Sequence, residues 1–267
     1  RLRLSGVRAR WDGQEALVLS DAEAEVSDLA TRPQLRVQGQ AKGPLEAWMA
    51  GVRSTALQGL LGEALDGVQA RGDGVLQLDL ALALHGDYKS KVSGHFDFSK
   101  ARVEWSPDLP VATQAKGRVS FDEQGVQVSV PSAQLLGGAA RVDVRIAEGR
   151  AWQAQVQGDY SVAALRQWPR LQAALPGLAS ASGASDYRLQ MQGRADQVST
   201  WTLDGGLKGV ALDLPAPLGK SAAQDWRVQW RQQAAEHVLS VGPGQAPVLH
   251  ARWQVAAPRW RGFVAAG

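Results

Sequence analysis

The chain has 267 residues, of which 45% are hydrophobic and 21% charged, a balance that excludes an intrinsically disordered protein. Its net charge is only +3, and its 29 basic residues alternate with apolar ones instead of forming a patch, which argues against nucleic-acid binding. The absence of cysteine excludes disulfides and thiolate metal sites.

The chain contains no apolar run of about 18 residues, the length that a membrane-spanning helix needs, and no signal peptide. It starts at Arg1, without methionine and already within an alternating pattern of apolar and polar residues. We therefore expect residues 1–267 to form one continuous segment of a longer protein.

Short segments in which every second residue is apolar recur along the chain. In the clearest one, GVLQLDLALALHG (74–86), leucine occupies every second position from Leu76 to Leu84. This period indicates a strand with one apolar and one polar face. Segments of this kind lie at 34–39, 75–85, 91–99, 117–122, 126–130, 141–146, 152–158, 187–193, 201–205, 210–214, 226–230 and 249–255.

Turn residues separate these segments, as at Asp122-Glu123-Gln124-Gly125 and Gly137-Gly138. Such short connections join antiparallel neighbours. The spacing therefore predicts a mainly β fold, a long twisted meander of roughly fifteen strands whose order follows the chain.

Two stretches depart from this period and predict short amphipathic helices. Residues 44–65 begin with Pro44, which suits a first helical turn, and residues 161–175 begin at Ser161, a suitable N-cap, and contain Pro169. The first helix has an apolar stripe, which we expect to pack on the apolar side of the sheet. This stripe includes Leu45, Trp48, Met49, Val52 and Leu61.

Two helices are too few to cover the apolar faces of so many strands, which leaves three arrangements. A structural or adhesive β-sandwich would bury these faces between two sheets. An outer-membrane β-barrel would turn them toward lipid, but many of the segments have five to seven residues, fewer than the about 9–11 of a spanning strand. A single curled sheet would line a groove for an apolar ligand.

The most distinctive stretch is LKGVALDLPAPLGK (207–220). Its pattern L-x-G-V-x-L-D-L-P-x-P-x-x-K resembles a strand motif of the YhdP branch of AsmA-like proteins. Residues 117–146, with a strand, a turn and a strand ending in AQLLGG, and residues 43–52, GPLEAWMAGV, are similar to the same family.

This resemblance implies a meander curled into an open hydrophobic half-pipe, part of a bridge that carries phospholipids between the two membranes of a Gram-negative bacterium. The segment would lie in the periplasm, and the full-length protein would be anchored in the inner membrane by a helix absent from this chain. Phospholipid would be its main partner, with other envelope proteins as further partners.

On this interpretation, acyl chains would contact the apolar residues of the strands. The predicted lining residues are Leu76, Leu78, Leu80, Leu82, Leu84, Phe96, Phe98, Val126, Val128, Val142, Val144, Ile146, Val156, Leu189, Met191, Leu203, Leu212, Leu214 and Val228. Five tryptophans share the apolar parity and are expected to be packing or rim residues: Trp152, Trp201, Trp226, Trp230 and Trp253.

Nothing in the sequence indicates an enzyme. The four histidines, His85, His95, His237 and His250, are scattered and lack the spacing of a metal site. Neither a nucleophile elbow nor a dinucleotide-binding fingerprint occurs. We expect no catalytic residues, no metal and no cofactor.

Overall fold

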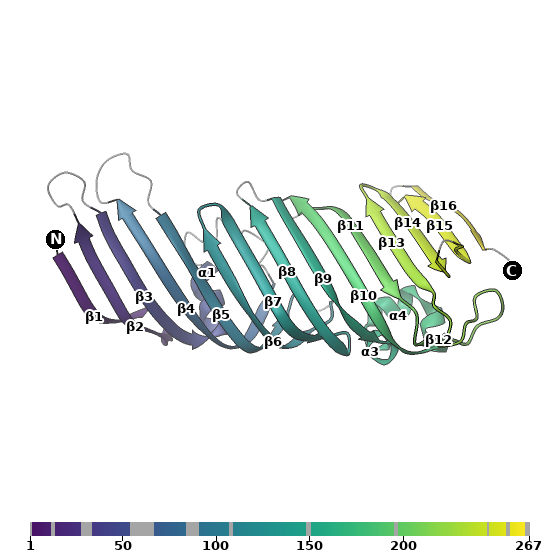
Figure 1. The fold of residues 1–267 in the computed structure, drawn as a ribbon, viewed down its shortest axis with the longest axis horizontal. Coiled ribbons are helices and arrows are strands. Elements are labelled where there is room, and N and C mark those ends of the chain that lie inside the picture. The colour runs from purple at the N-terminus through teal and green to yellow at the C-terminus, as the bar shows by residue number, and fades with distance from the viewer. Residues whose placement is uncertain are drawn as a thin grey trace.

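The computed structural model of the chain describes residues 2–11, 14–27, 34–53, 67–83, 91–106, 109–147, 151–194, 197–244, 246–254 and 257–264. Within these ranges, the strands form one long antiparallel sheet (Figure 1). The strands are β1 (Leu2–Trp11), β2 (Gln14–Ser27), β3 (Gln34–Pro44), β4 (Gln69–Ala83), β5 (Lys91–Glu104), β6 (Ala112–Asp122), β7 (Gly125–Leu135), β8 (Gly138–Ala147), β9 (Ala151–Ser161), β10 (Ala181–Arg194), β11 (Gln197–Gly206), β12 (Val210–Leu212), β13 (Arg227–Gln233), β14 (Glu236–Gly242), β15 (Leu249–Gln254) and β16 (Ala257–Val264).

The order of strands in the sheet follows the order of the chain, as the turn spacing predicts. Only β12 leaves this order, because it pairs with the start of β10. In the described part of the chain, β1 and β16 stand at opposite ends of the order, so the sheet is open. Contacts between strands there are almost all between sequence neighbours, so no second sheet packs on the first, as a sandwich would require.

The strands are longer than the alternating segments of the sequence. β4 has 15 residues and β5 has 14. The difference arises at β-bulges, where the register shifts and the alternation breaks while the strand continues. Lys100 and Gln114 adopt positive φ angles of 54° and 52° at such shifts in β5 and β6. The alternating segments of five to seven residues therefore mark only part of most strands, whereas β13, β14 and β15 have no more than seven residues.

Among the described residues, four short helical segments interrupt the meander. Helix α1 (Leu45–Arg53) follows β3, and it is the described part of the predicted helix 44–65. The predicted helix 161–175 is divided into α3 (Val162–Arg166) and α4 (Pro169–Ala174), followed by a 3₁₀ helix at Pro176–Ser180. Ser161 caps α3 as predicted, since its hydroxyl accepts a hydrogen bond of 3.2 Å from the Ala164 amide.

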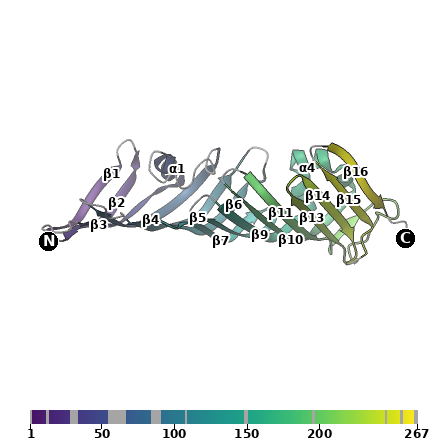
Figure 2. The same cartoon turned by 90° about the horizontal axis from the view of Figure 1, so that it is seen from above.

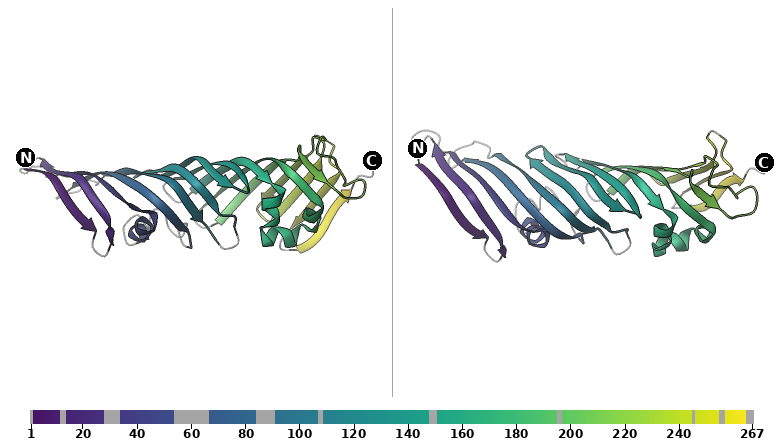
Figure 3. Two further views of the ribbon diagram at one scale, coloured as in Figure 1. Left: turned by 90° about the horizontal axis from the view of Figure 1, so that it is seen from below. Right: turned by 60° about the horizontal axis from the view of Figure 1, so that its bottom comes forward.

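The helices lie along one edge of the sheet and on one of its faces. In an antiparallel meander, the connections after β3, β9 and β11 reach the same edge, and these connections hold α1, α3 with α4, and β12. We call this edge the helical edge, and the opposite edge, with tight turns at 123–124 and 234–235, the turn edge. Figures 2 and 3 show α1 and α4 on the same side of the sheet.

The buried core follows the helical edge. Its side chains come from the strand ends next to the helices and from the helices themselves. Many are alanines, such as Ala101, Ala133 and Ala181, and small side chains let a helix approach the sheet closely. One group surrounds α1, and another joins Tyr160 and Val162 to Val210 of β12.

Candidate functional site

The apolar residues of successive strands share one face of the sheet. Strand register connects them into rows that cross the sheet from neighbour to neighbour. One row can be followed through twelve paired strands, and its members from β3 to β10 are all apolar. This row consists of Ala41, Leu76, Phe96, Val119, Val128, Val144, Ala154, Met191, Trp201, Gln232, His237 and Trp253.

Most of the predicted lining residues lie on this apolar face. Fifteen of them share it by register and parity: Leu76, Leu78, Leu80, Phe96, Phe98, Val126, Val128, Val142, Val144, Ile146, Val156, Leu189, Met191, Leu203 and Val228.

The other four predicted residues differ in position. Leu82 is in register with Leu35, and its side chain is outside the described part; Leu84 lies outside the described residues. Leu212 belongs to β12 and packs against the buried cluster at the helical edge. Leu214 follows β12, outside the strands, and its Cδ1 lies beside Gly177.

Exposure of the apolar face changes from one edge to the other. At the helical edge Ala101 is 0% exposed and Val130 is 8% exposed. Toward the turn edge, Leu80, Val144 and Met191 are only partly buried, and in the described part of the chain no helix or second sheet covers them. A continuous apolar strip therefore runs along the sheet beside its helix-covered edge.

Helix α1 packs on the apolar face through the predicted stripe. Leu45 and Trp48 are buried and Met49 packs with them, which confirms the prediction for these residues. The Val52 side chain and Leu61 lie outside the described part. Phe96 occupies the space above Gly74, where an added Cβ would lie 1.9 Å from the phenyl ring, so a larger residue at this position would force the ring to move.

The opposite face of the sheet is polar and carries cross-strand ion pairs. Arg118 donates hydrogen bonds of 2.6 and 2.8 Å to Asp97, and these lower the pKa of Asp97. Hydrogen bonds from Gln38 and Arg36 likewise lower the pKa of Asp79. All these carboxylates are well exposed, so the face is a hydrated surface and its ion pairs contribute little stability.

The twist of the sheet also hollows this polar face. One depression of about 910 Å³ lies over β2 to β8 and is lined by polar side chains such as Gln77 and His95 and by apolar ones such as Leu78 and Phe121. Another, of about 510 Å³, lies between Arg141, Asp186 and other charged residues. The charged lining of the second depression suits water or charged groups and not an acyl chain.

The distinctive motif 207–220 forms a closed loop at the helical edge. The Nζ atom of Lys220 is buried and donates hydrogen bonds to the carbonyl oxygens of Leu207 (2.8 Å), Ser221 (2.9 Å) and Val210. Burial lowers the pKa of this lysine. The motif lysine therefore holds the loop together from inside and does not face the apolar strip.

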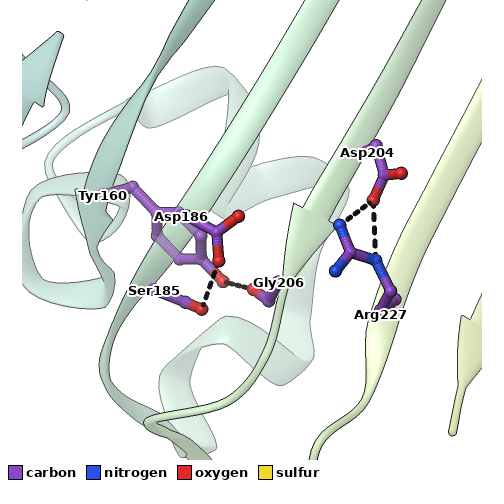
Figure 4. A network of polar contacts seen from close by, with 6 residues as sticks. All are labelled: Tyr160, Ser185, Asp186, Asp204, Gly206 and Arg227. Carbon is purple, nitrogen blue, oxygen red and sulfur yellow. Dashed lines mark hydrogen bonds and ion pairs between the residues drawn. The ribbon is translucent and has the colours of Figure 1, made fainter.

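Two buried tyrosines, Tyr160 and Tyr187, lie next to this loop. The Tyr160 hydroxyl donates a hydrogen bond of 2.8 Å to the Gly206 carbonyl, bridging β9 to β11 across β10 (Figure 4). The Tyr187 hydroxyl is buried without a partner in the described part of the chain. Burial raises the pKa of each tyrosine to about 12. On the polar side, Arg227 is paired with Asp204 (Figure 4).

The sequence patterns do not predict one feature of the apolar face. Trp201, Trp230 and Trp253 lie on this face, as their parity predicts, but they surround His237, which is 9% exposed. A lone histidine in an alternating strand carries no signal for such a cluster, because the cluster depends on pairing between four strands.

A comparison with protein families identifies a match over most of the chain. The family model described as YhdP protein matches residues 14–256. No curated protein and no solved structure matches the chain. Among the described helices, none has the length and apolar character needed to cross a membrane.

Proposed function

This chain belongs to the YhdP family, and we propose that it is a segment of a lipid-transfer bridge that shields phospholipid acyl chains on its apolar face. The observation that supports this proposal best is the exposed apolar face of a single open sheet, on which the apolar row continues without a polar residue from β3 to β11. With strands about 4.8 Å apart, fifteen strands in succession extend this face over about 70 Å.

The physical basis of the proposal is that acyl chains need only apolar contact. Each buried CH₂ group contributes about 0.8 kcal/mol, so side chains from a few strands can hold a lipid tail. Along a row such as Phe96, Val119, Val128 and Val144, one apolar contact replaces the next at nearly constant free energy. A lipid can therefore move along the strip without passing a deep binding minimum.

The proposed function implies a location in the cell. The segment would lie in the periplasm of a Gram-negative bacterium, in a protein anchored in the inner membrane by a helix outside this chain, and would pass phospholipid toward the outer membrane. Its partners would be phospholipid and other envelope proteins. No catalytic step and no cofactor belong to this function.

The direct test is lipid content. The purified chain is extracted with organic solvent, and phospholipid is quantified by mass spectrometry per mole of protein. We expect bound phospholipid that exchanges with labelled lipid added in vesicles. A folded chain that carries no phospholipid and acquires none from vesicles would contradict the proposal and favour a structural module.

A further inference from the structure

The apolar row that crosses the sheet contains polar residues at only one end. From Ala41 to Trp201 its members are apolar or aromatic, but Gln232 and His237 follow, before Trp253. A polar group on an apolar face loses water and needs a hydrogen-bond partner. The presence of Gln232 and His237 at this place therefore calls for an explanation.

Four rings form a compact group here, which we call the aromatic cluster: Trp201, Trp230, His237 and Trp253. The ring centroids of Trp201 and Trp230 are 4.8 Å apart, and Trp253 lies 5.9 Å from Trp230. The imidazole of His237 stacks on Trp253 at 5.1 Å with an angle of 7° between the ring planes. Four strands, β11, β13, β14 and β15, contribute one ring each.

Hydrogen bonding in the aromatic cluster is incomplete. Trp201 Nε1 donates to the Gln232 side chain, and Gln232 Nε2 donates to the Ala234 carbonyl at 3.1 Å, so these groups are paired. In contrast, Trp230 Nε1 and His237 Nδ1 are buried and have no hydrogen-bond partner among the described residues. An unpaired buried group is costly, so two such atoms in one cluster point to a ligand that completes them.

The aromatic cluster lies at the turn edge, where the apolar strip meets solvent. His237 follows the turn at 234–235, and Trp253 is the second-last residue of β15. A lipid whose chains lie on the strip has its polar part at such a boundary. Tryptophan suits this position because its ring is apolar and its N–H is a donor.

We propose that the aromatic cluster binds the oxygen-rich glycerol region of a phospholipid, with an ester or phosphate oxygen accepting a hydrogen bond from Trp230 Nε1–H and another from the His237 imidazole. This inference rests on the proposed function. An indole N–H can only donate, so its partner must be an acceptor. In a phospholipid, acceptor oxygens adjoin the acyl chains directly. Because neighbouring rings cover both atoms, binding requires the rings to part.

The first measurement follows the indole N–H signals by ¹H–¹⁵N NMR. Trp230→Phe identifies the Trp230 signal by its loss. Addition of a short-chain diacyl phosphatidylglycerol is expected to shift this signal downfield. The diether analogue, which keeps the phosphate but lacks ester carbonyls, shows which oxygen accepts. A shift of similar size and affinity with glycerol 3-phosphate alone would indicate an anion site and overturn the proposal.

The second measurement compares affinities. His237→Phe and Trp230→Phe keep the apolar surface, and we expect each to weaken phospholipid binding about tenfold, while binding of the hydrocarbon diphenylhexatriene stays unchanged. Trp152→Phe, on the same face in β9, is the matched control and should change neither.

The outcomes separate the two proposals. A chain that binds neither phospholipid nor diphenylhexatriene contradicts the proposed function, and with it this inference. A chain that binds both, but whose His237 and Trp230 variants lose affinity for neither or for both equally, leaves the proposed function intact and overturns the role of the aromatic cluster.

Discussion

The indole ring of Trp48 meets the phenyl ring of Phe96 edge to face, with ring centroids 5.6 Å apart. Trp48 belongs to α1 and Phe96 to β5, so this contact fixes the helix on the apolar face. The position of α1 therefore determines which part of the apolar face is covered there and which part stays open.

Trp48→Ala should detach α1 from the sheet. We expect a loss of about 3–5 kcal/mol in the free energy of unfolding, since a large buried ring is removed. Trp48→Phe should cost much less, because Trp48 Nε1 is buried without a partner in the described part and no hydrogen bond is lost. Urea denaturation measures both.

The matched control for Trp48 is Trp105→Ala, because Trp105 is 43% exposed. It should change the free energy of unfolding by less than about 0.5 kcal/mol. Equal losses for Trp48→Ala and Trp105→Ala would show that α1 does not depend on the contact with Phe96.

Val144→Asp should abolish phospholipid binding and leave the fold intact. Val144 lies on the uncovered part of the apolar face, where a carboxylate keeps its water and interrupts the path of an acyl chain. Circular dichroism reports the fold, and mass spectrometry of extracted lipid reports binding.

The control for Val144→Asp is Gln153→Asp, in register with Arg145 on the polar face. It introduces the same charge and should retain lipid. If Val144→Asp unfolds the chain, the face is sealed by another layer, since burying an unpaired charge costs several kcal/mol.

The two buried tyrosines form a natural pair for comparison. Tyr160→Phe should destabilise the chain by about 1 kcal/mol, because the Gly206 carbonyl loses its donor. Tyr187→Phe removes a hydroxyl without a partner in the described residues and should be neutral or slightly stabilising. The reverse order in thermal unfolding would contradict the hydrogen bonding in the structure.

Alkaline pH should unfold the chain through the same tyrosines. Their pKa of about 12 exceeds the ordinary value of 10 because burial disfavours the anion. The stability associated with the protonated hydroxyls is complete below pH 10 and is lost as the pH rises through 12. Absorbance at about 295 nm follows tyrosinate; in urea, all tyrosines should titrate near their ordinary value of about 10.

Lys220→Met should loosen the loop 207–226 while the rest of the sheet keeps its structure. Three carbonyl oxygens lose their common donor, and each buried unpaired acceptor costs about 1–3 kcal/mol. Amide hydrogen exchange should become faster in this loop alone. Lys208→Met, at an exposed lysine in the same loop, should leave exchange unchanged.

The sequence is sufficient to predict the meander and its apolar face, because period two assigns each residue of a strand to a face. It does not predict strand length, since bulges near Lys100 and Gln114 break the period inside β5 and β6. Leu212 shows a second limit. It has the alternation of a lining residue, but the loop closed by Lys220 turns it toward the helical edge. The environment of His237 likewise depends on pairing between distant residues.

Because the strands pair mainly with their neighbours in the chain, the length of the sheet can vary with the number of strands. Apart from β12, the strands of the described part pair only with their neighbours in chain order, so the fold sets no condition on the number of strands. Duplicating one hairpin would lengthen the structure by about 10 Å and require no compensating change elsewhere. A protein built in this way can be matched to the width of the gap that it crosses by counting hairpins, without redesigning a core.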